Sequence, residues 1–90
     1  MTPEEIKALL EDNKKKLLQE VSESKELVFL LKESATRKLT QKEKHKVNKQ
    51  LLDICKMIPA FAIFLLPGGA ILLPLMIKFI PKMLPSSFRE

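Results

Sequence analysis

The sequence has neither tryptophan nor tyrosine, and only one cysteine, one histidine and two glycines among 90 residues. A single cysteine excludes an internal disulfide framework, and one cysteine with one histidine excludes the usual zinc-finger spacings. The glycines, Gly68 and Gly69, are adjacent, so no dinucleotide fingerprint or phosphate-binding loop is present. We therefore expect no cofactor, no metal and no enzymatic activity. A chain of this length forms one small domain at most, and its core is marginal unless a partner or a membrane supports it.

Charge is distributed unevenly along the chain. The net charge is +5, but residues 1–56 hold 13 of the 16 basic and 10 of the 11 acidic side chains, whereas residues 57–90 hold 3 and 1. The mean hydropathy of −0.01 is therefore an average over two unlike regions. We predict a charged helical-hairpin arm at 1–56, an apolar membrane segment at 57–80 and a short basic tail at 81–90.

Two helix-start signals lie in the charged arm. Thr2 and Glu5 have the spacing of a capping box, with proline at the first helical position between them, and Thr40 with Glu43 repeats the box. Apolar residues at helical spacing follow each signal. Three polar residues interrupt the first apolar stripe: Asn13, Glu20 and Ser24.

The predicted fold is all-α. A helix over residues 3–34 pairs with a second helix over 40–57, and the second helix continues directly into the apolar segment. Residues 57–77 contain 21 consecutive residues without a charged or classically polar side chain. As a helix this run is roughly 31 Å long, which matches a hydrocarbon core of about 30 Å.

The first interpretation of the apolar run is one proline-kinked transmembrane helix, because membrane helices tolerate proline when neighbouring groups satisfy the freed carbonyls. Six residues are predicted to shape its packing in the membrane: Pro59, Pro67, Gly68, Gly69, Pro74 and Pro81. A turn at residues 66–70 would instead give a re-entrant helical hairpin. A buried core helix is disfavoured, because the rest of the chain offers too little surface to cover an apolar tail of 34 residues.

Seven basic residues precede the apolar run and are predicted to set its topology or to contact lipid headgroups: Arg37, Lys38, Lys42, Lys44, Lys46, Lys49 and Lys56. Because more basic residues precede the apolar run than follow it, the amino terminus is predicted to lie on the cytoplasmic side. Nucleic acid is a less favoured partner, because no stacking aromatics are interleaved. We expect His45 to be exposed and Cys55 to be a small buried thiol.

Residues 49–88 carry five prolines, of which the first four, Pro59, Pro67, Pro74 and Pro81, follow one another at intervals of seven or eight. The motifs are Ile58-Pro59, Phe64-Leu65-Leu66-Pro67, Leu72-Leu73-Pro74, Lys78, Pro81 and Met83-Leu84-Pro85-Ser86-Ser87-Phe88. With these motifs the segment resembles the membrane core of the leucine-zipper EF-hand transmembrane (LETM-type) family, in a version similar to bacterial members. The resemblance implies an inner-membrane protein linked to exchange of potassium or calcium against protons, and ribosome association through a domain that follows the span.

Two departures limit what the resemblance implies. Ala70 stands where mitochondrial members have an acidic residue, so residues 57–77 offer no ionisable group for an ion pathway. The resemblance also places the start of the ribosome-binding domain at Glu90, so ribosome binding is expected only of the family.

We therefore predict a non-enzymatic membrane anchor or assembly module of the bacterial inner membrane, linked to cation and proton homeostasis. Its expected partner is the lipid bilayer, with a possible homo-oligomer and no DNA. An oligomeric cation channel or cation/proton exchanger subunit is the alternative. A soluble helical protein-interaction module is a further alternative.

Overall fold

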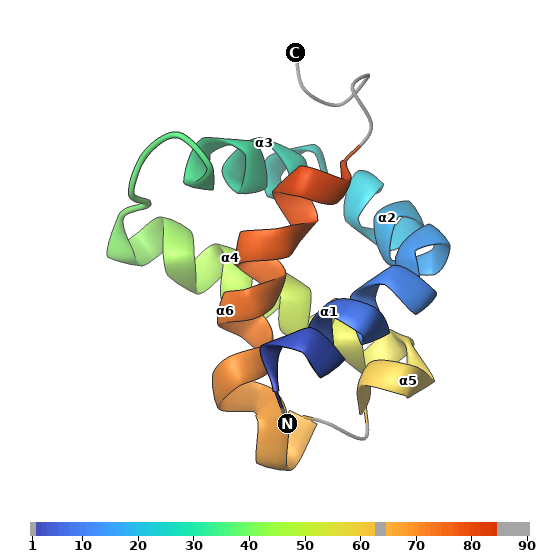
Figure 1. The fold of residues 1–90 in the computed structure, drawn as a ribbon. Coiled ribbons are helices and arrows are strands. Elements are labelled where there is room, and N and C mark those ends of the chain that lie inside the picture. Colours follow the sequence, from blue (N-terminus) through green and yellow to red (C-terminus); the bar gives the residue numbers. More distant parts are fainter. Residues whose placement is uncertain (1, 63–64, 85–90) are drawn as a thin grey trace.

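The computed structural model describes residues 2–62 and 65–84, with side chains described for all of these except residues 66–70. The described helices are α1 (Pro3–Asp12), α2 (Lys14–Ser22), α3 (Lys25–Ser34), α4 (Gln41–Met57), α5 (Pro59–Ala62) and α6 (Leu65–Met83). Within these ranges no strand occurs, so the prediction of an all-α fold is confirmed for them. Figure 1 shows α6 passing through the centre of the molecule, where it contacts α1, α3 and α4.

Both predicted capping boxes are present. The Thr2 hydroxyl oxygen accepts a hydrogen bond from the Glu5 amide at 3.2 Å, and the Glu5 carboxylate accepts one from the Thr2 amide at 3.0 Å. At the start of α4 the same pair of bonds joins Thr40 and Glu43, at 3.1 Å and 2.9 Å. Each box satisfies amide donors that have no partner inside the helix, which fixes where α1 and α4 begin.

The predicted single helix over residues 3–34 is wrong, because the polar residues in its stripe break it into three helices. Asn13 separates α1 from α2, and its side-chain amide donates to the Leu9 carbonyl at 2.9 Å. Ser24 caps α3, its hydroxyl accepting from the Leu27 amide at 3.1 Å. These breaks let three short helices turn their apolar faces toward one centre, where one straight helix could not.

The predicted continuation of the second helix into the apolar run is also wrong. α4 ends at Met57, and Ile58 is extended, with φ −105° and ψ 107°. A residue before proline is driven out of the helical region, and Pro59 follows as the first residue of α5. The predicted re-entrant turn is wrong as well, since the backbone of residues 66–70 lies within α6.

α6 is a core helix of the bundle. Leu72, Met76 and Ile80, spaced four residues apart, are each 0% exposed. They join a single apolar cluster whose other buried members come from every other described helix, from the connections between helices and from the residue after α6: Ile6, Leu10, Leu17, Val21, Leu27, Leu30, Leu31, Leu39, Val47, Leu51, Ile54, Cys55, Ile58, Phe61 and Leu84. The described residues bury no polar or charged side chain. The disfavoured interpretation, a buried core helix, is therefore the one that the structure adopts.

Across residues 2–62 and 65–84, no helix has the length and apolar character needed to cross a membrane. The prediction of a kinked transmembrane helix is thus not supported. The cover that the sequence reading judged insufficient is the combined apolar stripe of α1 to α4, assembled by the breaks at Asn13 and Ser24.

Candidate functional site

The exposed face of α4 carries a row of lysines. Lys42, Lys49 and Lys56 are seven residues apart and exposed, so they share one side of the helix at intervals of about 10.5 Å. The opposite side of α4 buries Val47 and Leu51 in the core. We call these three residues the α4 lysine stripe.

Within the described residues, no ion pair engages the α4 lysine stripe. Lys46, beside it, lies 3.4 Å from the Glu26 carboxylate of α3, and Asp53 is exposed on the same side. Exposed pairs of this kind contribute little to folding, and a charge run is most simply a solvated face. The stripe nevertheless keeps an excess of positive charge, because it holds three lysines and only one carboxylate, that of Asp53.

The connection between α3 and α4 is fixed by Arg37. Its guanidinium donates to both carboxylate oxygens of Glu43, at 3.0 Å and 2.9 Å, and to Glu33 at 3.1 Å. These hydrogen bonds lower the pKa of Glu43 to about 2, together with the bond from the Thr40 amide, and they hold the pKa of Arg37 above its ordinary value. Arg37 was predicted as a topology or headgroup residue, but here its charge is offset by two carboxylates.

Beside this connection lies a groove of about 420 Å³ between the α3–α4 connection, α4 and α6. We call it the Lys38–Ile77 groove. Its lining residues are Ser34, Arg37, Lys38, Leu39, Lys44, Asn48, Pro74 and Ile77. One wall is therefore cationic and able to donate hydrogen bonds, and the other is apolar.

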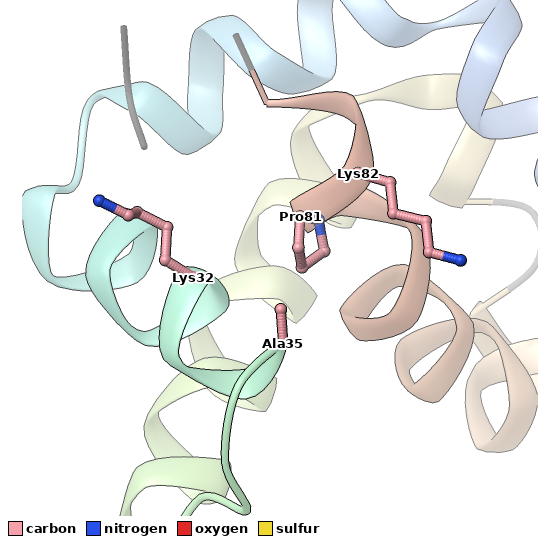
Figure 2. Close-up of a pocket in the computed structure, with 4 residues that line it drawn as sticks. All are labelled: Lys32, Ala35, Pro81 and Lys82. Atoms are coloured by element: carbon pink, nitrogen blue, oxygen red, sulfur yellow. The ribbon is translucent and has the colours of Figure 1, made fainter. Parts of the chain in front are cut away.

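Two further hollows surround the carboxyl end of α6. One, of about 480 Å³, is lined by Lys7, Glu11, Lys14, Phe79, Lys82 and Met83. The other, of about 330 Å³, is lined by Lys32, Ala35, Pro81 and Lys82. Figure 2 shows Lys32 and Lys82 pointing away from each other on either side of Pro81, so this second hollow does not gather their charges.

The predicted proline and glycine residues lie in two helices, α5 and α6. Pro59 is exposed at the start of α5, Pro74 is exposed within α6, and Pro81 is half-buried. Pro67, Gly68 and Gly69 lie in the first turns of α6, and their side-chain surroundings are outside the described part of the chain. Their role in membrane packing stays a prediction.

The single histidine and single cysteine have the environments expected of them. His45 is exposed. The thiol of Cys55 is buried 3.5 Å from the sulfur of Met76, and burial raises its pKa to about 11. Such a thiol is almost wholly protonated at neutral pH and is a poor nucleophile. No cluster of His, Cys, Asp or Glu able to hold a metal occurs among the described residues.

Sequence reasoning did not predict the Lys38–Ile77 groove. Leu39 and Asn48 were not singled out, and Pro74 and Ile77 were assigned to lipid packing. The only sequence signal for Asn48 is its place four residues after Lys44 on α4, which puts the two on neighbouring turns. Nothing local in the sequence indicates that α6 packs beside them.

The fold and its surface define a small all-α module with one strongly basic helix face and an apolar helix at its centre. The family described as "LETM1-like, RBD" matches residues 39–90, more than half of the chain. The chain belongs to this LETM1-like family, as the proline motifs indicated.

Relatives match at moderate identity. The fission yeast Schizosaccharomyces pombe has the "LETM1 domain-containing protein mdm28, mitochondrial", which is 32% identical over 88% of this chain and 16% of its own length. The Saccharomyces cerevisiae protein "LETM1 domain-containing protein YLH47, mitochondrial" is 32% identical over 69% of this chain and 14% of its own. In Drosophila melanogaster the "Mitochondrial proton/calcium exchanger protein" is 39% identical over 57% of this chain and 5% of its own. The chain thus spans a small part of each relative, and no solved structure matches it.

Two expectations from the resemblance are not supported. These relatives are eukaryotic mitochondrial proteins, which gives no support to a bacterial version of the family. The family described as "LETM1-like, RBD" matches residues 39–90, which include the whole segment that the resemblance assigned to a membrane core, so that assignment is not supported either.

Proposed function

We propose that the chain is a non-enzymatic docking module of a LETM-type protein at the mitochondrial inner membrane, and that the α4 lysine stripe holds a ribosome through phosphates of its RNA. The observation that carries this proposal is an exposed lysine stripe without an ion pair in the described structure, inside the residues matched to the family description. We interpret "RBD" in that description as ribosome-binding domain. The mitochondrial location is supported by the names of the relatives.

The chemistry of the stripe fits contact with phosphates rather than with bases. Lysine ammonium groups bind phosphates as point charges, and each contact releases counterions, so affinity falls steeply with salt. The chain has no tryptophan or tyrosine, and α4 has no phenylalanine, so His45 is the one ring on α4 that could stack on a base. The docking would be specific for the shape of the RNA surface and not for its sequence.

A link to cation and proton homeostasis belongs to the same proposal, and the name of the fly relative supports it. α6 carries no carboxylate, which is the default group of an intramembrane ion path. The contribution of this chain would therefore be to assembly and not to ion passage.

Sedimentation of the full chain with mitochondrial ribosomes over a salt series tests the proposal. Lys42→Gln/Lys49→Gln/Lys56→Gln should reduce the slope of log affinity against log salt by about 2 to 3, since each phosphate contact contributes about 0.7 to 0.9. The matched control is Lys7→Gln/Lys15→Gln/Lys25→Gln, which removes the same charge from α1 to α3. Equal slopes in the two triple variants would show that only net charge matters and would contradict the proposal.

A further inference from the structure

The Lys38–Ile77 groove has an amphipathic lining that the α4 lysine stripe does not share. Leu39 is buried in the floor of the groove, and Pro74 and Ile77 form the α6 wall. Opposite them, Lys38 and Lys44 are exposed cations. Positive charge and apolar surface thus line one groove of about 420 Å³.

The donors of the groove differ in how far they are already engaged. Arg37 is held by Glu33 and Glu43, so it positions the connection. The Ser34 hydroxyl donates to the carbonyl of Leu31 at 2.6 Å. Three other groups make no hydrogen bond or ion pair within the described residues: the ammonium groups of Lys38 and Lys44 and the amide of Asn48. These three groups are available to a ligand.

We propose that this groove holds an anionic phospholipid of a bilayer surface. The phosphate would lie between Lys38, Lys44 and Asn48, and an acyl chain would lie along Pro74 and Ile77. This inference does not rest on the ribosome proposal, since it uses other residues and another ligand.

The combination of charge and apolar surface favours this occupant over RNA. The phosphates of RNA would gain no favourable contact from the apolar wall. The groove also has no aromatic ring on which a base could stack. A phospholipid presents a negative phosphate next to hydrocarbon, which complements both walls. Ile71, 38% exposed and about one turn before Pro74 in α6, adds exposed apolar surface near this wall. Peripheral modules bind membranes by burying such a wall at the headgroup boundary while lysines face anionic lipid.

Co-sedimentation of the full chain with vesicles tests the proposal. We expect binding to phosphatidylcholine vesicles that contain phosphatidylglycerol, and little binding to pure phosphatidylcholine. Lys38→Gln/Lys44→Gln should weaken the binding about 30-fold, because each lysine near an anionic surface contributes a factor of about five to six. The control is Lys15→Gln/Lys16→Gln, which removes equal charge from a polar hollow on α2, far from the α3–α4 connection in Figure 1. This control should bind nearly as the wild type does.

The apolar wall needs its own variant, which leaves every charge in place. Pro74→Ser/Ile77→Ser should weaken vesicle binding about 10-fold, and circular dichroism would check that it folds. If the double variant unfolds, the single variant Pro74→Ser, at an exposed position, is measured in its place. It should weaken vesicle binding by a smaller factor.

Three outcomes would overturn the proposal. The first is an equal loss of vesicle binding in the two lysine double variants, which would show that net charge and not the groove determines the binding. The second is vesicle binding by a folded apolar-wall variant that equals wild type. The third is binding of a ribosomal RNA fragment or of polyglutamate that depends on Lys38 and Lys44 while the vesicles are not bound.

Discussion

The two longest helices, α4 with 17 residues and α6 with 19, reach the same core from opposite kinds of sequence. α4 is mostly polar and buries one narrow stripe, whereas α6 is mostly apolar and also buries one stripe. In α4 the unburied side is a row of lysines, and in α6 it is Ile71, Pro74 and Lys78. The comparison shows that burial follows one face of each helix and not its average hydropathy. What remains on the other face is exposed to solvent.

The most severe test of this comparison places a charge on each side of α6. Met76→Asp should destabilise the fold by at least about 4 kcal/mol, because it puts an unpaired carboxylate into the core. Ile71→Asp should cost about 0.5 kcal/mol or less, because Ile71 is 38% exposed. Urea unfolding of the two variants in detergent-free buffer measures both effects. Equal damage at both positions would mean that α6 is surrounded by apolar material on all sides.

A second test removes apolar volume from each helix. Leu72→Ala in α6 and Leu51→Ala in α4 should each cost about 2 to 5 kcal/mol, since both side chains are 0% exposed. Met57→Ala, at a residue 54% exposed, is the control and should change stability by about 0.5 kcal/mol or less. If Leu72→Ala has a small effect and Leu51→Ala a large one, α6 does not pack in the same core as α4.

The start of α4 offers a smaller effect. Thr40→Ala removes the side-chain acceptor of the capping box and should cost about 1 kcal/mol, measured by thermal unfolding. Thr40→Ser, which keeps the hydroxyl oxygen, is the control and should retain most of the stability. If Thr40→Ala is as stable as wild type, the capping box does not hold the start of α4.

The pair of Arg37 and Glu43 predicts a dependence on acid. The pKa of Glu43 is lowered from 4.5 to about 2 in the folded chain, so the folded state binds this proton less readily than the unfolded state. The resulting stabilisation is fully present above pH 4.5 and is lost as the pH falls toward 2. Glu43→Gln keeps the capping geometry and should reduce the change of the thermal unfolding midpoint with pH below 4.5. Glu23→Gln, at an exposed residue outside the pair, should leave that pH dependence unchanged. Equal profiles for the wild type and Glu43→Gln would exclude the pair as a source of stability.

The smallest effect on stability is expected on the outer face of α4. Each of the substitutions Lys42→Gln, Lys49→Gln and Lys56→Gln should change the unfolding free energy by about 0.5 kcal/mol or less, because these side chains are exposed and unpaired in the described structure. Chemical denaturation of the single variants checks this. A loss several times larger would give the stripe a structural role and weaken the case that it is a binding surface.

Much of the hydrophilic half could be predicted, because its signals are local. The capping boxes at Thr2 and Thr40 lie within four residues each, and both are confirmed. The stripe of Val47, Leu51 and Ile54 is buried as its helical spacing indicated. The breaks at Asn13 and Ser24 were visible as polar interruptions, but their consequence depends on packing.

The apolar half could not be predicted, because hydropathy says that a segment avoids water and does not say what covers it. Leu72, Met76 and Ile80 would be equally well buried by lipid or by α1, α3 and α4. Pro59 illustrates the same limit, since a kink within a helix and the start of a new helix both follow from a proline. The groove is least predictable, as it joins Lys44 to Ile77 across more than thirty residues of sequence.

Native-state hydrogen exchange on the full chain in detergent-free buffer tests most directly whether the arm of α1 to α4 covers α6. We predict that the amides around Leu72, Met76 and Ile80 have the same opening free energy as the core amides of α1 and α3. Leu10→Ala should lower the opening free energies of all these amides together, because α1 packs on α6. Exchange of the α6 amides at the rate of a free peptide, with protection only after lipid is added, would contradict the account.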